Sequence, residues 1–307
     1  MTSRAPLPPA LDPAPFTTSE ALQKGVSSSR LRALDLDSRF HGIRITAAEP
    51  HSLYQLCVAR SLRFPSDAFI SGETAAVLRQ VPLPRELEQS NIIHVTVPEG
   101  RRALSGRGLR GHAARVAPTD VVEWKGLALS SAARMWCELG ASLALPDLVA
   151  AGDYLVNREL AHTSVTQLEA SLAVFAGRQG RSRLAHALGM LDDNSASRRE
   201  SHLRVLAIEQ GLTGYVTNMK IVTSGGFTYY GDLTFPTERV VVEYQSRYHF
   251  DLDQQRKDMT RRSRLEADGW AVVFINADDL GNPRELAARI RAVLSSHSRH
   301  FAGDARR

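Results

Sequence analysis

The sequence predicts an α/β protein, of the α+β kind, with a helical front part followed by a mixed sheet flanked by helices. Its 307 residues suggest about two domains. From residue 194 onward, helical and strand patterns follow in the order α-βββ-α-β-α, which indicates a sheet with helical layers. Residues 129–176 are instead largely apolar and helical in pattern. These two sequence patterns together predict the fold class.

Composition excludes several classes of protein. The formal charge of +5, from 38 basic and 33 acidic residues, is too small to imply a polyanionic partner by itself. No apolar run reaches the roughly 18 residues that would predict a membrane span. Cys57 and Cys137 lie in apolar helical segments, so we expect free thiols and a cytoplasmic protein. Residues 1–15 hold five prolines and are expected to form a disordered leader.

Residues 16–50 have the outline of a winged helix-turn-helix. Two short helices are predicted around Gly25, and residues 40–45 are expected to form the wing. Arg30 and Arg32 then lie on the second helix, where side chains that contact DNA would be. The alternative is a purely structural pair of helices.

Residues 51–190 are predicted to form a mixed, mainly helical domain. The segment SGETAAVLRQ is helical in pattern up to the prolines that follow it, and the β-branched run NIIHVTVPEG predicts a strand. Residues 101–115 contain five arginines, three glycines and no acidic residue. They form either a solvated loop or an arm that follows phosphates.

Residues 191–300 carry the α-βββ-α-β-α pattern. The predicted elements are a helix at 197–210, strands at 215–223, 227–235 and 240–246, a helix at 251–268, a strand at 270–276 and a last helix from 284 to about 295.

Two carboxylates are expected to face each other in this sheet. A four-residue turn at 236–239 sets Phe235 opposite Val240, which places Asp232 opposite Glu243. Cβ atoms of such a pair lie about 5 Å apart, so the charges repel each other unless a cation neutralises them. A divalent cation, Mg²⁺ or Mn²⁺, suits oxygen ligands of this kind. The alternative is a pair of solvated carboxylates on an exposed face.

Glu200 is a third candidate acid. It lies beside the apolar stripe of the helix that precedes the sheet, near the face expected to pack on it. The same residue completes a capping box with Ser197, and this second role has equal weight.

The helix after the third strand is strongly basic. It contains Arg256, Lys257, Arg261, Arg262 and Arg264. Because this helix follows the acidic strands, its cations are predicted to bind phosphates beside the metal. The alternatives are a solvated charged face and ion pairs between Asp258 and the arginines one turn later.

Residues about 190–297 resemble the very-short-patch-repair-like endonucleases, a branch of the restriction-endonuclease-like fold. The resemblance covers about a third of the chain and rests on Glu200, Asp232, Glu243-x-Gln245, His249, Asp258-x-x-Arg261 and the segment GWAVVFINADDL.

The resemblance implies that Asp232 and Glu243, with the carbonyl of Tyr244, hold Mg²⁺. It also implies that Glu200 orients a water molecule or a second ion.

The chain departs from the family pattern at two places. Gln245 stands where many members of the wider fold have lysine, and Gly231, not proline, precedes Asp232. His249 is expected to assist proton transfer in place of the missing lysine.

The first 180 residues are similar to the N-terminal part of abortive-infection antitoxin-like proteins, which implies DNA binding and regulation of the protein's own transcription. Two functions therefore remain open. One is a metal-dependent nuclease that cuts DNA, and the other is an inactive DNA-binding regulator. A nuclease that processes RNA shares the metal site, although we find no aromatic platform for stacking bases.

Overall fold

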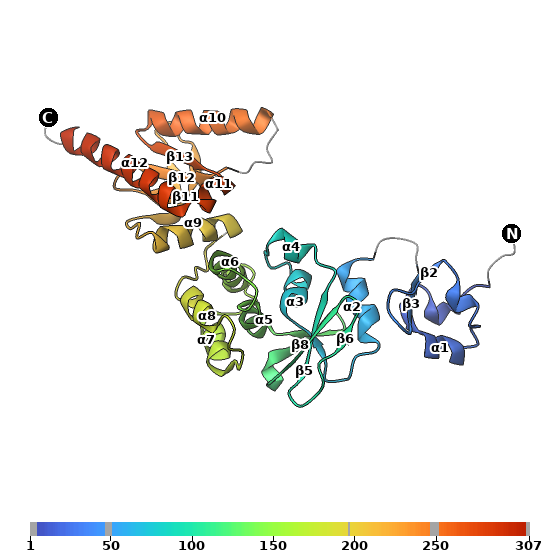
Figure 1. Cartoon of the computed structure of the whole chain (residues 1–307). Coiled ribbons are helices and arrows are strands. Elements are labelled where there is room, and N and C mark those ends of the chain that lie inside the picture. The colour runs from blue at the N-terminus through green and yellow to red at the C-terminus, as the bar shows by residue number, and fades with distance from the viewer. Residues whose placement is uncertain (1–4, 47–50, 196, 246–251, 305–307) are drawn as a thin grey trace. The chain divides into compact units, whose positions relative to one another are not determined.

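A computed structural model describes the chain at residues 5–46, 51–195, 197–245 and 252–304. Helices and mixed sheets make up the protein, which confirms the α/β class (Figure 1). The chain forms two units, one from residues 1–141 and 167–181 and the other from residues 142–166 and 182–307. The division therefore differs from the predicted boundary near residue 190.

The N-terminal part of the first unit is built around a three-stranded sheet of order β1-β3-β2. Its elements are η1 (Pro9–Leu11), β1 (Phe16–Thr17), α1 (Thr18–Gln23), η2 (Arg30–Arg32), β2 (Leu36–Asp37) and β3 (Ile43–Thr46). The prediction of a second α-helix is wrong, since only the single 3₁₀ turn η2 forms there. Ser27 Oγ accepts a hydrogen bond from the Arg30 amide and competes with helical bonding.

The two arginines predicted to contact DNA differ in their surroundings. The Arg30 guanidinium donates to both carboxylate oxygens of Asp35, at 2.9 and 2.8 Å, and to the Ala5 carbonyl at 2.7 Å. Its side chain is only 10% exposed, so Arg30 holds this part of the chain together rather than facing a ligand. Arg32 is exposed, and its contact with DNA stays a prediction.

A six-stranded sheet forms the rest of the first unit, and sequence analysis predicted only one of its strands. The order is β6-β7-β5-β4-β9-β8. The strands are β4 (Phe69–Ile70), β5 (Ile93–Pro98), β6 (Ser105–Gly106), β7 (Leu109–Ala114), β8 (Val121–Trp124) and β9 (Leu127–Ser130). Four of them have two to four residues, too few to show strand periodicity. Residues 101–115 are thus a hairpin of β6 and β7 rather than a loop.

Helices α2 (Leu53–Ser61), α3 (Gly72–Leu78), α4 (Arg85–Glu88) and α5 (Ala132–Leu139) accompany this sheet, together with η3 (Pro118–Asp120) and most of α7 (Val165–Val174). The helix predicted within SGETAAVLRQ and the strand within NIIHVTVPEG are confirmed as α3 and β5.

The second unit contains the predicted α-βββ-α-β-α pattern in full. Its elements are α6 (Leu145–Val156), α8 (Arg181–Leu188), α9 (Arg198–Glu209), β10 (Val216–Val222), β11 (Thr228–Phe235), β12 (Val240–Tyr244), α10 (Leu252–Ala267), β13 (Ala271–Ile275), α11 (Ala277–Gly281) and α12 (Pro283–Asp304). The sheet has the order β10-β11-β12-β13, with β12 and β13 parallel and the other pairs antiparallel.

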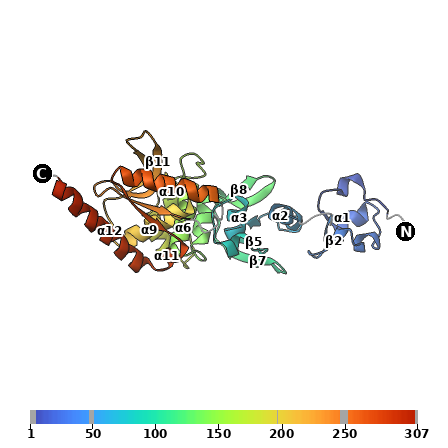
Figure 2. The ribbon, with the colours of Figure 1, turned by 90° about the horizontal axis from the view of Figure 1, so that it is seen from above.

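Helices cover both faces of this sheet. On one face, Leu203 and Leu206 of α9 and Leu286 of α12 pack against Val240 and Val242 of β12. On the other face, α10 packs against the sheet and contributes Leu265 to a smaller apolar cluster that includes Val241. Figures 1 and 2 show α10 and α12 on opposite sides of the strands.

A buried ion pair fixes α9, the helix that carries Glu200. Arg204 of α9 pairs with Asp153 of α6, and both side chains are almost fully buried. Asp153 also accepts hydrogen bonds from the Ser201 hydroxyl at 2.6 Å and from the Asp192 amide at 2.8 Å. Burial raises the pKa of Asp153 to about 6, although the charge of Arg204 opposes that rise. The ionised pair is therefore sensitive to the loss of either partner.

No helix in the described ranges is long and apolar enough to cross a membrane. Cys57 and Cys137 are both free and buried, as predicted, and burial raises the pKa of their thiols to about 12 and about 11.

We expect the substitution Arg204→Met to destabilise the fold by about 3–5 kcal/mol, because it leaves the Asp153 carboxylate buried without its cation. Urea denaturation measures the loss. Arg158→Met is the matched control, since Arg158 forms an exposed pair with Asp193 and its loss should change little. Equal stability of the two variants would show that the buried pair does not hold α9 in place.

Candidate acidic active site

The register of β11 and β12 brings Asp232 and Glu243 together. Phe235 pairs with Val240 and Leu233 with Val242, as the four-residue turn predicted, and the next position along this ladder would set Asp232 opposite Glu243. The Asp232 carboxylate accepts a hydrogen bond of 2.7 Å from the Tyr244 amide. The charge of Asp232 also acts on Glu243, so the two carboxylates lie near each other, while their direct pairing across the strands stays a prediction.

Glu243 lies in a buried position, not on an exposed face. Its exposed fraction is 7%, and it shares the α10 side of β12 with Val241. Burial raises the pKa of Glu243 to about 7, Arg261 opposes this rise, and Asp232 and Asp258 add to it. Burial likewise raises the pKa of Asp232. The interpretation of two solvated carboxylates is thus wrong.

The sheet is distorted where Asp232 lies. The ladder between β10 and β11 pairs Thr217 with Leu233 and Met219 with Gly231, but it skips Asn218 and Asp232 between them. Asn218 has a left-handed backbone, with a φ of 48°. Such distortions are common beside functional sites, where they redirect a side chain.

Gly231 explains one departure from the family pattern. A Cβ atom at this position would lie 2.8 Å from Val241 Cγ1 and 2.4 Å from Thr234 Oγ1. A proline ring has no room there, and its missing amide would weaken the pairing of Gly231 with Met219. The distorted strand therefore requires a residue without a side chain.

Glu200 reaches the same edge of the sheet from the first turn of α9. Its Oε2 accepts a hydrogen bond of 2.6 Å from Asn218 Nδ2, and its negative charge contributes to the raised pKa of Asp232. Ser197 caps the helix by accepting from the Glu200 amide at 3.2 Å. The cap by Ser197 is therefore confirmed, whereas the carboxylate of Glu200 bonds to Asn218, and its role as a third acid of the site stays a prediction.

Arg261 of α10 neutralises the acidic pair in this structure. Its Nη2 lies 2.6 Å from Glu243 Oε1, and it also donates to the Tyr230 carbonyl. The guanidinium carbon is 5.3 Å from the centre of the Tyr229 ring. Arg261 therefore pairs with Glu243 rather than with Asp258, and its contact with phosphates stays a prediction.

The other cations of α10 have different surroundings. Arg256, Lys257 and Arg262 are exposed, and Arg262 pairs with Glu266 at 2.7 Å. Arg256 and Lys257 are therefore two exposed candidates for phosphate contact on this helix. Their role in binding nucleic acid stays a prediction.

Sequence analysis missed Asn218 and Arg199. Arg199 lies on α9 with its guanidinium carbon 4.9 Å from the centre of the Tyr244 ring, and its charge lowers the pKa of Asp232 against the larger effect of burial. A signal for Asn218 was present, because asparagine is enriched at left-handed positions and is rare in strands. No signal in the sequence places Arg199 near Asp232, which requires the packing of α9 on the sheet.

Gln245 is exposed just after β12, and its amide donates to the Ile275 carbonyl at 2.7 Å. His249 lies outside the described residues, so its predicted part in proton transfer is not placed. The backbone of Tyr244 is held by its amide bond to Asp232.

The donors present suit Mg²⁺ or Mn²⁺ in their chemistry. Glu243 Oε1 is buried and, within the described residues, has no hydrogen-bond partner, although Arg261 lies close to it. Carboxylate oxygens of this kind are ligands that Mg²⁺ prefers. No group of three or more acidic, histidine or cysteine side chains placed to hold a metal occurs in the described part of the chain. Asp232 and Glu243 would therefore need oxygens from the backbone, from water or from a substrate to complete a metal site.

Comparisons with known proteins place the chain beside others without assigning a function. No protein-family model matches it. Two curated relatives from Mycobacterium tuberculosis, named uncharacterized protein MT2308 and uncharacterized protein Rv2248, are each 31% identical over 131 residues. The alignments cover 42% of this chain, and the chain spans about half the length of these relatives, 48% in each case.

Among solved structures, the crystal structure of the RV2827C protein from Mycobacterium tuberculosis matches 69% of this chain and 85% of its own. The sequence identity is 15% and the TM-score is 0.39, a similarity too low to assign a fold.

The substitution Glu243→Gln tests the burial of this acid. Because burial raises the pKa of Glu243 from 4.5 to about 7, the folded protein holds a proton that the unfolded chain releases. Stability of the metal-free protein should therefore fall by up to about 3 kcal/mol as pH rises between these two pKa values. Glu243→Gln should remove that part of the slope in urea denaturation at several pH values.

Glu285→Gln is the control, because Glu285 is an exposed carboxylate on α12. If the Glu243 variant and the wild type keep the same dependence on pH, the carboxylate is not buried in solution.

Proposed function

We propose that the second unit hydrolyses phosphodiester bonds in DNA with the help of a divalent cation. The observation that carries the proposal is the closeness of Asp232 and Glu243, a half-buried and a buried acid on neighbouring strands, with Glu200 reaching the same edge. A sheet that only needed stability would not place like charges opposite each other. The order of these acids along the chain, with the resemblance to the very-short-patch-repair-like endonucleases, supports the same activity.

Bound Mg²⁺ would lower the pKa of a water molecule and stabilise negative charge on the phosphate oxygens. Asp232 and Glu243, with the Tyr244 carbonyl, would hold the ion. The amide of Tyr244 already fixes one carboxylate oxygen of Asp232, which leaves the other oxygen for this role. Asn218 holds Glu200, which would orient a water molecule by accepting its hydrogen bond.

The basic side chains of α10 would hold the substrate. Arg256 and Lys257 are exposed on the helix that packs beside Glu243, where they can bind phosphates that flank the scissile bond. Arg261 would hold Glu243 in position rather than bind substrate, because its donors face Glu243 and the Tyr230 carbonyl.

DNA is the proposed substrate because the front part of the chain is similar to DNA-binding antitoxin-like proteins. In that part of the chain, the sequence predicts that Arg32 contacts DNA, and its side chain is exposed. The free, buried thiols Cys57 and Cys137 are compatible with the cytoplasm, where DNA would be met.

A catalytically inactive DNA-binding regulator is the second candidate, and specific observations favour it. Gln245 cannot supply the charge or the proton of the lysine that many restriction-endonuclease-like proteins carry, and Arg261 already neutralises Glu243. A plasmid-nicking assay with Mg²⁺ or Mn²⁺, beside a gel shift on the gene's own upstream DNA, separates the two functions. Cutting supports the nuclease, and binding without cutting supports the regulator.

Asp232→Asn should lower metal-dependent cleavage by at least about 100-fold, because an amide holds a divalent cation far less well than a carboxylate. Plasmid nicking measures the loss, and thermal denaturation checks that the variant folds. Glu285→Gln makes the same kind of change on an exposed part of α12 and should cleave like the wild type. Equal cleavage by the Asp232 variant and the wild type would overturn the assignment.

A further inference from the structure

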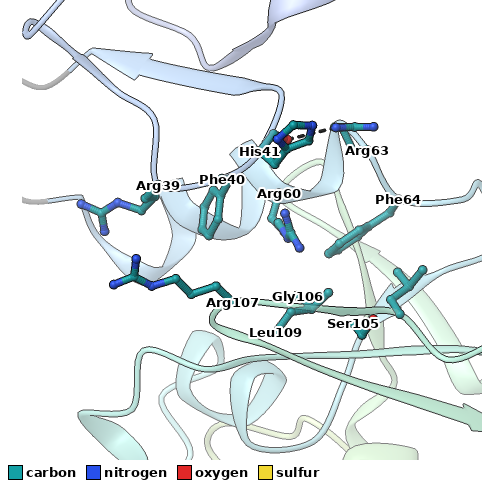
Figure 3. Close-up of a pocket in the computed structure, with 11 residues that line it drawn as sticks. Arg39, Phe40, His41, Arg60, Arg63, Phe64, Ser105, Gly106, Arg107 and Leu109 are labelled. Atoms are coloured by element: carbon teal, nitrogen blue, oxygen red, sulfur yellow. Dashed lines mark hydrogen bonds between the residues drawn. The ribbon is translucent and has the colours of Figure 1, made fainter. Parts of the chain in front are cut away.

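An arginine-rich pocket lies in the first unit, in the part of the chain that does not contain Asp232 and Glu243. Its volume is about 390 Å³, and none of its eleven lining residues is acidic. Four of those residues are arginines: Arg39, Arg60, Arg63 and Arg107. Figure 3 shows the side chains of Arg39 and Arg107 extending to the same side of the pocket, with Arg60 nearer its centre.

Three short segments build the pocket. The last turn of α2 and the residues after it contribute Arg60 and Arg63, which are three residues apart and so lie on one side of the chain. The hairpin of β6 and β7 contributes Arg107 at its turn, where Gly108 has a φ of 69° that favours glycine. The segment before β3 contributes Arg39.

The guanidinium groups of Arg60 and Arg63 each lie close to the backbone of a glycine. A Cβ atom on Gly106 would lie 2.7 Å from an end nitrogen of Arg60, and a Cβ atom on Gly42 would lie 2.5 Å from one of Arg63. Both guanidinium groups therefore rest directly over backbone that carries no side chain. Burial lowers the pKa of Arg60 and the positive charge of Arg63 lowers it further, so the two guanidinium groups are close enough to interact.

Positive charge in the pocket exceeds the negative charge that the protein supplies. Arg39 pairs with Asp37, but within the described residues Arg60, Arg63 and Arg107 form no ion pair. Arg63 donates to the His41 carbonyl at 3.0 Å, and Arg60 lies 5.2 Å above the centre of the Phe40 ring. The Nε atom of Arg60 is buried and has no hydrogen-bond partner among the described residues.

Burying a cation without a partner costs free energy, and an anion with several acceptor oxygens would lower that cost. Guanidinium groups match phosphate in particular, because their donors form a planar fork. Arg110 of the hairpin and Arg102, which precedes the hairpin, are also exposed and extend the charge beyond the pocket. A row of cations that continues along a hairpin suits a chain of phosphates better than a single small anion.

We propose that this pocket binds a phosphate group of the DNA backbone, with Arg60, Arg63 and Arg107 as its ligands. The contact is independent of base sequence and belongs to a different unit of the chain from the acidic site. It rests on DNA being a partner of the protein, as in the proposed function, but not on cleavage. A free phosphate or a mononucleotide presents the same chemistry, and the experiment distinguishes these sources.

The test uses the full chain with labelled duplexes of two unrelated sequences, in EDTA so that no cleavage occurs. The double variant Arg63→Gln/Arg107→Gln should weaken binding to both duplexes by about 10-fold or more and should reduce the slope of log affinity against log salt by about 1–2. Arg85→Gln removes an exposed charge from α4 in the same unit and should change binding much less. Thermal denaturation identifies any loss of folding, and the single variant Arg107→Gln at the exposed turn serves if the double variant is unstable.

Calorimetry with inorganic phosphate and with AMP provides the second arm. If the variant loses affinity for phosphate or AMP while its affinity for duplex DNA is unchanged, the pocket serves a small ligand and the proposal is overturned. An unchanged affinity for every probe also overturns it. If Asp232→Asn keeps full affinity for DNA while the arginine variant loses it, the proposal that the pocket binds DNA is supported, whether or not the acidic site cuts DNA.

Discussion

The turn at 236–239 brings Asp232 and Glu243 close together on β11 and β12. The electrostatic repulsion between these two carboxylates is the constraint on which the second unit depends. The hydrophobic core fixes the register of these two strands, since Val240 and Val242 must face α9 and α12. A slip by one residue would turn Glu243 toward those apolar side chains and turn the valines toward α10. The fold therefore cannot relieve the repulsion by moving a strand, and relief has to come from a proton or a cation.

The structure uses both kinds of relief. Arg261 places a positive charge 2.6 Å from Glu243, and burial raises the pKa of that acid to about 7, so a proton competes with other cations near neutral pH. Asn218 donates a hydrogen bond to the carboxylate of Glu200, whose negative charge adds to the rise that burial causes in the pKa of Asp232. The local left-handed backbone at Asn218 is thus part of the same arrangement, because it turns the amide toward α9.

Sequence reasoning predicted the second unit well because its strands have five to eight residues and glycine or proline turns between them. The register of Asp232 and Glu243 followed from counting across one turn. The six-stranded sheet was largely missed, since strands such as β4 and β6 have two residues and show no period. The partner of Arg261 was also missed, because helical spacing favours Asp258 while the packing of α10 on the sheet brings Glu243 closer.

The charges around the acidic site set a condition on any nucleic-acid substrate. When Glu243 is ionised, the three carboxylates of Glu200, Asp232 and Glu243 exceed the two guanidinium groups of Arg199 and Arg261 by one formal negative charge. A phosphodiester carries the same sign, so the bare site repels it. One divalent cation reverses the sign of the site and allows a phosphate to approach. Binding at the acidic site would then depend on the same cation as the chemistry, whereas the arginine pocket of the first unit requires none. A protein that holds DNA through that pocket alone would bind without metal and cut only with it.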